Sequence, residues 1–117
     1  RQMCIRDSLQ VVSEHHPKQM SQPMTKESAE QLKAMMASVV NNGTGKRARI
    51  NGTTVGGKTG TAQTVKGKAP YAWFVGWSDN PHVAVAVFIQ SSDTAINEVS
   101  GGRLAAPIAR DVIEAMR

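Results

Sequence analysis

Apolar residues recur at helical spacing in two segments of the chain. The first predicts a helix over 28–42, because its apolar side chains fall on one face. They are Leu32, Met35, Met36, Val39 and Val40. Either Thr25 or Ser28 can cap the start of this helix, and Asn41-Asn42-Gly43 favours its end, because Asn and Gly accept left-handed backbone angles. We expect this methionine-rich stripe to pack in the core.

The second segment predicts a helix from Arg103 to the end of the chain, after a break at Gly101-Gly102. Pro107 fits only near the first turn, where amide protons lack helical partners. The apolar stripe of this helix consists of Leu104, Ile108, Val112 and Met116, with Ala105, Ala109 and Ile113 beside it.

Three segments between the helices favour extended structure. Residues 53–64 are rich in Thr, Val and Gly, and residues 71–77 read YAWFVGW. Residues 83–89 read VAVAVFI, which is apolar on both faces and predicts a central strand covered on both sides. The turn residues at 78–81 join the last two segments into an antiparallel hairpin. The order of elements predicts an α+β fold, with an antiparallel sheet flanked by helices.

The remaining segments give weaker signals. Residues 1–24 are polar and irregular, apart from a short strand expected at Leu9–Val12. The stretch RQMCIRDS at 1–8 has no periodicity, and we interpret it as a foreign leader, which leaves 9–117 as the natural part. Residues 43–52 are expected to form a loop with a short strand at Ala48–Ile50.

Length and composition exclude several classes of protein. The chain has 117 residues, which allows one domain at most. Its longest apolar run, Val83–Ile89, is far shorter than the roughly 20 residues of a membrane-spanning helix. The single cysteine, Cys4, excludes an internal disulfide framework, and we expect it to be inert. His15, His16 and His82 lack metal-ligand spacing, so no metal site is predicted.

The chain is basic, with 14 Lys and Arg against 9 Asp and Glu. A basic balance is compatible with nucleic-acid binding. The densest group, Lys46, Arg47 and Arg49, has no aromatic residues interleaved for base stacking. We therefore interpret the positive charge as a solvated face and predict no nucleic-acid partner.

The segment GGKTGTAQ at 56–63 supports two competing interpretations. Residues 52–59 match the phosphate-binding pattern GxxxxGK[ST] literally. Such a loop must follow a buried strand and open a helix, because the helix N-terminus supplies free amides to the phosphates. Residues 46–51 make a poor buried strand, and residues 60–67 make a poor helix. Nucleotide binding is therefore not predicted.

The second interpretation is the KTG element of serine acyl transferases. On a strand, Lys58 and Gly60 point one way and Thr59 and Thr61 the other. The lysine favours a carboxylate, and the threonine hydroxyls can hydrogen-bond to it. Gly60 lets an acyl substrate lie close to the backbone, where an amide can face a developing oxyanion.

Over roughly residues 9–117 the sequence closely resembles the C-terminal part of the penicillin-binding protein transpeptidase domain, of the class B actinobacterial type. The matching pieces stand in the family's order at 21–45, 55–64, 71–77, 82–90 and 101–116. The resemblance implies the C-terminal portion of a β-lactamase/transpeptidase-like fold. It also implies D,D-transpeptidation of peptidoglycan, in which a serine attacks the penultimate D-Ala carbonyl of a stem peptide. β-Lactams acylate the same serine, and no cofactor is implied.

Roles for four residues follow from the resemblance alone. Lys58 is implied to assist proton transfer, and Thr59 and Thr61 to bind the carboxylate of the substrate or of penicillin. The Thr61 amide is implied to form half of the oxyanion hole, beside Gly60. The expected location is the extracytoplasmic face of the cell membrane, through an anchor outside this sequence. A cell-wall glycosyltransferase is the expected partner, in a role in cell shape or division.

Two further motifs of the family, SxxK and SxN, are expected before KTG and are absent there. Ser78-Asp79-Asn80 spells SDN after KTG, and we interpret it as turn composition. The chain is thus interpreted as a fragment without its nucleophile, inactive and poorly soluble by itself. A serine β-lactamase or β-lactam sensor domain remains an alternative, as does a non-catalytic wall-binding module. Trp73 and Trp77 are expected in the core, or in the wall of a substrate groove.

Overall fold

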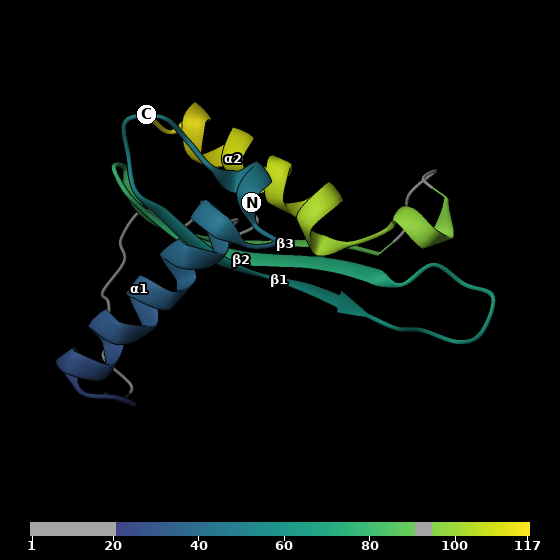
Figure 1. The fold of residues 1–117 in the computed structure, drawn as a ribbon, viewed down its shortest axis with the longest axis horizontal. Helices are drawn as coiled ribbons and strands as arrows, with labels where there is room; N and C mark the ends of the chain where they lie inside the picture. The colour runs from purple at the N-terminus through teal and green to yellow at the C-terminus, as the bar shows by residue number, and fades with distance from the viewer. Residues whose placement is uncertain (1–20, 91–94) are drawn as a thin grey trace, which may run out of the picture.

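The computed structural model describes residues 21–90 and 95–117 of the chain (Figure 1). Within them an antiparallel sheet is flanked by helices, which confirms the predicted fold class. The elements are α1 (Lys26–Asn42), η2 (Lys46–Ala48), β1 (Val55–Ala62), β2 (Tyr71–Asp79), β3 (His82–Ile89), η3 (Ile96–Glu98), η4 (Gly101–Ala105) and α2 (Ala106–Ala115).

The three strands lie in the order β1-β2-β3, and both pairs are antiparallel. The strand at the centre of the described sheet is therefore β2. The prediction of a central strand covered on both sides was wrong for β3 within the described residues, where this strand lies at an edge of the sheet. Its residues alternate between half-buried and exposed, because in the described chain α2 packs against one face of β3.

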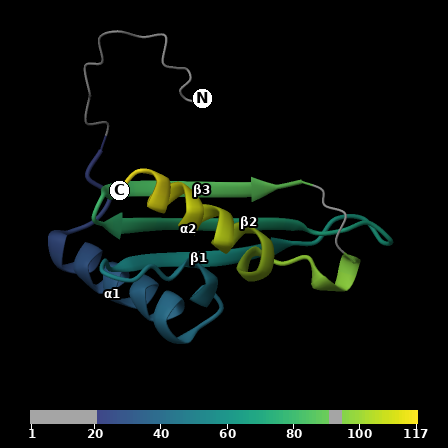
Figure 2. The same cartoon turned by 90° about the horizontal axis from the view of Figure 1, so that it is seen from above.

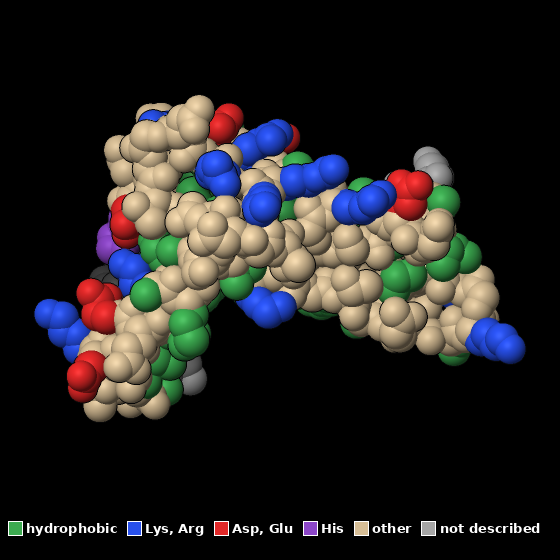
Figure 3. All heavy atoms as spheres, viewed as in Figure 1, with side chains coloured by type: hydrophobic (Ala, Val, Ile, Leu, Met, Phe, Trp, Pro, Cys, Tyr) green, Lys and Arg blue, Asp and Glu red, His purple; other side chains and the backbone are tan. Residues whose placement is uncertain are grey.

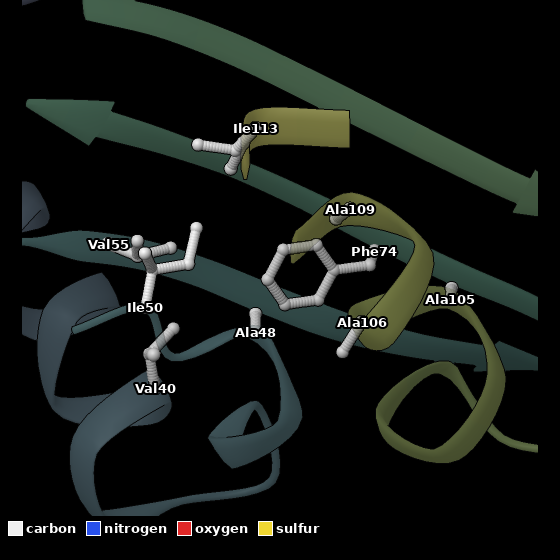
Figure 4. Packing of buried hydrophobic residues seen from close by; sticks show 9 residues of the cluster. All are labelled: Val40, Ala48, Ile50, Val55, Phe74, Ala105, Ala106, Ala109 and Ile113. Carbon is white, nitrogen blue, oxygen red and sulfur yellow. The ribbon is translucent and has the colours of Figure 1, made fainter. Parts of the chain in front are cut away.

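One face of the sheet carries the core (Figure 4). Phe74 of β2 is completely buried there, among residues of α1, η2 and α2. Helix α2 lies across this face, as Figure 2 shows. The cluster consists of Val40, Ala48, Ile50, Val55, Phe74, Ala105, Ala106, Ala109 and Ile113, with Val83, Val85, Val87 and Ile89 packed against it.

The stripe that α2 turns to the sheet differs from the predicted one. Ala105, Ala109 and Ile113 are buried, whereas Ile108 and Val112 are exposed. Small alanine side chains let the helix approach the sheet closely, and this selects the neighbouring stripe. The predicted single helix is also divided, because η4 is a π-helix that precedes α2.

Helix α1 begins two residues earlier than predicted, and Thr25 is its cap. The Thr25 hydroxyl accepts a hydrogen bond of 3.2 Å from the Ser28 amide. The methionine-rich stripe is not core in the described chain, since Val40 alone is buried within α1. Lys33 instead lies 4.6 Å above the Trp77 ring and pairs with Asp79 at 3.4 Å.

The second face of the sheet is largely open. Trp73 stacks on Phe88 across the strand pair, with ring centroids 4.3 Å apart. Their exposures are 40% and 45%, and Val75 beside them is also exposed. Core packing was therefore a wrong prediction for Trp73 in the described chain, whereas Trp77 is half-buried next to α1.

Several sequence predictions lie outside the described residues. They concern the leader at 1–8, the strand at Leu9–Val12, Cys4, and the pair His15 and His16. The prediction of a short strand at Ala48–Ile50 was wrong, because Lys46–Ala48 forms a 3-10 helix.

Neither helix in the described ranges combines the length and apolar character required to cross a membrane.

Candidate functional site

The KTGT residues occupy β1, one of the two edge strands of the described sheet. Thr59 lies opposite Phe74 and Thr61 opposite Ala72 across the β1–β2 pair. Both threonines therefore share the sheet face that carries Phe74, while Lys58 and Gly60 belong to the other face. This is the alternation that the sequence predicts. A strand at this position also excludes the phosphate-binding loop, since β1 continues to Ala62 where such a loop would open a helix.

The backbone of β1 directs the two threonine amides toward the open edge. The Asp79 amide donates to the Thr54 carbonyl at 3.1 Å, so Thr54 and Asp79 form a hydrogen-bonded pair. Hydrogen-bonded pairs alternate along antiparallel strands. The pairs that contain Thr59 and Thr61 are thus the non-bonded ones, whose amides and carbonyls point away from β2. The Lys58 ammonium donates to the Thr59 carbonyl at 2.7 Å, as this orientation allows.

A cleft of about 380 Å³ lies beside this edge. Thr59 and Thr61 line one wall, and residues of three other segments complete it. They are Thr44, Lys46, Arg47, Ser100, Gly102 and Arg103. The cleft thus combines hydroxyl groups with three cationic side chains, a lining that suits an anionic ligand.

Two hydrogen bonds hold the threonine hydroxyls in place. The hydroxyl oxygens of Thr44 and Thr59 lie 2.7 Å apart, and the Gly101 amide donates to the Thr61 hydroxyl at 3.4 Å. A hydroxyl can donate one hydrogen bond and accept two. Both groups therefore keep capacity for a ligand while their rotamers are restrained.

Glycines bring η4 against the strand that carries the threonines. A Cβ at Gly101 would overlap the Trp73 carbonyl oxygen and would come within 2.7 Å of the Gly60 carbonyl oxygen. A Cβ at Gly102 would overlap the Thr44 carbonyl oxygen. The break that the sequence shows at these two glycines is thus a close contact between backbones, which places the Gly101 amide beside Thr61.

A second pair of glycines shapes the start of β1. The Phe74 ring lies where a Cβ of Gly57 would be, and the Trp77 ring lies where a Cβ of Gly56 would be. Aromatic rings from β2 therefore cross β1 on both faces just before Lys58. This packing fixes the position of the strand at the point where the candidate site begins.

The sequence missed the residues that complete the cleft. Thr44 belongs to the GTG loop, Ser100 precedes η4, and Arg103 lies within η4, so only the folded chain brings them to β1. Arg103 also pairs with Glu98 at 2.9 Å. The Ser78-Asp79-Asn80 sequence does not join them, because Ser78 lies opposite Val55, at the other end of β1. Its buried hydroxyl is 3.4 Å from that of Thr53.

Comparison with known proteins gives consistent similarities. Residues 2–114 match the family described as the penicillin binding protein transpeptidase domain. The chain is 36% identical over 109 residues to stage V sporulation protein D of Bacillus subtilis, covering 87% of the chain and 17% of that protein. It is 38% identical over 74 residues to the peptidoglycan D,D-transpeptidase PbpA of Mycobacterium tuberculosis, covering 59% of the chain and 15% of that protein.

Solved structures agree with the sequence comparisons. The D,D-transpeptidase domain of a peptidoglycan glycosyltransferase from Eggerthella lenta matches with a TM-score of 0.67 and 31% identity, over 87% of this chain and 24% of that one. The transpeptidase domain of FtsI4 D,D-transpeptidase from Legionella pneumophila matches with a TM-score of 0.65 and 33% identity, over 80% of this chain and 37% of that one. The chain thus spans less than half the length of each of these four relatives.

Proposed function

The chain belongs to the penicillin-binding protein transpeptidase domain family, and on that basis we propose that it forms the carboxylate-binding wall of a peptidoglycan D,D-transpeptidase. One observation carries the proposal. The hydroxyls of Thr59 and Thr61 line a cationic cleft at the open edge of β1, and their amides point to the same edge. These residues stand in the sequence KTGT.

In the proposed reaction, a serine oxygen attacks the penultimate D-Ala carbonyl of a stem peptide. A C–O bond forms, the C–N bond to the terminal D-Ala breaks, and the leaving amine takes up a proton. The amine of a second stem peptide then attacks the acyl carbonyl. A new C–N bond forms, the C–O bond to the serine breaks, and the proton that the amine loses returns to the serine oxygen. No serine in this chain is followed three residues later by lysine, so we place the nucleophile in another part of the protein.

Each residue of the KTGT segment has a proposed role. Thr59 and Thr61 donate hydroxyl hydrogen bonds to the terminal carboxylate, and the Thr61 amide faces the developing oxyanion. Gly60 allows the acyl chain to approach the strand closely, because this residue has no side chain. Lys58 supplies positive charge that favours the anionic substrate and assists proton transfer. Membership of this family also supports a location and a partner. We propose that the protein acts at the extracytoplasmic face of the membrane, with a glycosyltransferase as partner.

Penicillin acylation of the longer protein tests the role of the two threonines. We expect Thr59→Val and Thr61→Val each to lower the second-order acylation rate constant for a fluorescent penicillin by about 10- to 100-fold, through lost hydrogen bonds to the carboxylate. Valine keeps the shape of threonine and has a methyl group in place of the hydroxyl. Labelling intensity on denaturing gels, followed over time, provides the rate.

Thr64→Val is the matched control, because the Thr64 hydroxyl bonds to the Ala69 carbonyl at 3.0 Å, outside the cleft. This variant should be acylated at the wild-type rate. Wild-type rates in both site variants would refute the proposed carboxylate wall. A wild-type protein that hydrolyses penicillin rapidly would favour a β-lactamase, and one that is never acylated would favour a wall-binding module.

A further inference from the structure

The chain contains two Asn-Gly pairs, Asn42-Gly43 and Asn51-Gly52, neither of which lines the cleft beside β1. Asparagine deamidates readily before glycine, because the next backbone amide meets no side chain as it approaches the asparagine side chain. All four residues are exposed. Exposure therefore does not distinguish the two pairs, but their backbone hydrogen bonds do.

The first pair is held by the end of a helix. Asn42 is the last residue of α1, and the Gly43 amide donates to the Val39 carbonyl at 3.0 Å. The Gly43 nitrogen has to leave this hydrogen bond, and the last turn of the helix has to open, before the nitrogen can attack the Asn42 side chain. The fold therefore protects Asn42.

The second pair lies in the turn between η2 and β1. Within the described residues the Gly52 amide has no hydrogen-bond partner. Gly52 has a φ of +85°, and a Cβ there would meet only the Arg117 guanidinium, at 3.5 Å. In this part of the chain, no hydrogen bond has to break before the Gly52 nitrogen attacks Asn51.

The surroundings of Asn51 also favour negative charge. Asn51 lines a cavity of about 650 Å³, whose other described residues are Arg49, Arg110, Glu114 and Arg117. The Arg117 guanidinium donates to the Asn51 carbonyl at 3.1 Å, while Arg110 pairs with Asp111. Figure 3 shows Lys and Arg side chains gathered along the face that carries α2. Nearby cations favour the anion that forms when the Gly52 amide loses its proton, and they favour a carboxylate as the product.

We propose that Asn51 deamidates spontaneously in the folded protein, through a succinimide with Gly52, while Asn42 is protected. The Gly52 nitrogen bonds to the side-chain carbonyl carbon of Asn51. The side-chain nitrogen leaves as ammonia, together with the proton that the Gly52 amide gives up. Water then opens the ring at either carbonyl and yields aspartate or isoaspartate. The product adds a negative charge to the cavity, and isoaspartate also adds a methylene group to the backbone ahead of β1.

The test follows both pairs in the longer protein during incubation in mildly alkaline buffer. Tryptic cleavage separates them, because Asn51 belongs to the peptide 50–58 and Asn42 to the peptide 34–46. Mass spectrometry detects the conversion of amide to acid, and labelling by an isoaspartyl methyltransferase detects isoaspartate. In the folded protein we expect Asn51 to react at least about ten times as fast as Asn42. In urea the two should react at similar rates, because unfolding removes the hydrogen bond of Gly43.

Two glutamine variants serve as matched controls, since glutamine would have to form a larger ring, which closes far more slowly. Asn51→Gln should abolish the modification of peptide 50–58, and Asn42→Gln should leave the rate at Asn51 unchanged. Circular dichroism shows that each protein stays folded during the incubation. A folded protein in which Asn42 reacts as fast as Asn51, or in which Asn51 stays intact, would overturn the inference. The inference is independent of the proposed function, which penicillin acylation tests separately.

Discussion

At the scale of single residues, Thr59 and Thr61 depend on contacts made far away in the sequence. Thr44 and Gly101 hold their hydroxyls by hydrogen bonds of 2.7 Å and 3.4 Å. The second bond exists because Gly101 has no side chain and lies directly on the backbone of β1 and β2. The geometry of the cleft therefore relies on a glycine that takes no part in the proposed chemistry.

This dependence predicts that Gly101→Ala damages both the fold and the site. The added Cβ would meet backbone atoms of Trp73 and Gly60, which cannot move without disturbing the sheet. We expect a loss of roughly 1–3 kcal/mol in the free energy of unfolding, the usual cost of overpacking. Penicillin acylation of the longer protein should fall as well. Thermal denaturation and acylation rates provide the two measurements.

Gly67→Ala separates this steric effect from backbone strain. Gly67 has a φ of +85° in the β1–β2 connection, and a Cβ there would meet nothing within 4 Å. It should cost about 1–2 kcal/mol through the left-handed backbone angle alone, without slowing acylation. Equal acylation by the Gly101 variant and the wild-type protein would contradict the role given to Gly101.

At the scale of elements, the sequence predicted where helices and strands lie better than which face each one buries. The periodicity located α1, α2 and the hairpin of β2 and β3, because the signal is local. In α2, however, Ile108 and Ala109 belong to adjacent stripes, and the stripe with the alanine packs on the sheet. Hydrophobic pattern alone cannot distinguish a large exposed side chain from a small buried one.

Strand β3 illustrates the same limit. Its continuous apolar run predicts cover on both faces, but in the described chain Val85 and Val87 are half-buried while Ala84, Ala86 and Phe88 are exposed. The sequence of a segment determines its propensity to form a strand. It does not show whether another layer of the protein will cover each face of that strand. The prediction of the candidate site has the same limit, because local pattern predicts some of its residues and tertiary packing brings the others. Strand alternation correctly separated Lys58 from Thr59, whereas Arg103 reaches the cleft only through tertiary packing.

At the scale of the whole molecule, the two sheet faces differ sharply. One carries the core with Phe74 at its centre, and the other presents Trp73, Val75 and Phe88 to solvent. A contiguous apolar surface of this kind is uncommon on a stable monomer and favours association.

The open face predicts that the 117-residue chain, expressed alone, binds a hydrophobic dye strongly and is poorly soluble. Val75→Glu should weaken dye fluorescence, because it places a carboxylate on the open face opposite Lys58. Val65→Glu is the matched control, since Val65 is exposed in the β1–β2 connection, and it should leave the fluorescence unchanged. A monomeric, dye-silent chain with a sharp thermal transition would show that the open face needs no cover.

The central claim is that the edge of β1 at Thr59 and Thr61 binds the substrate carboxylate. A crystal structure of the longer protein acylated by penicillin tests it most directly. We predict that the penicillin carboxylate lies within about 2.6–3.2 Å of the hydroxyl oxygens of Thr59 and Thr61, with the acyl carbonyl oxygen accepting from the Thr61 amide. An acyl-enzyme whose carboxylate contacts neither threonine, with the cleft beside β1 empty, would contradict the account.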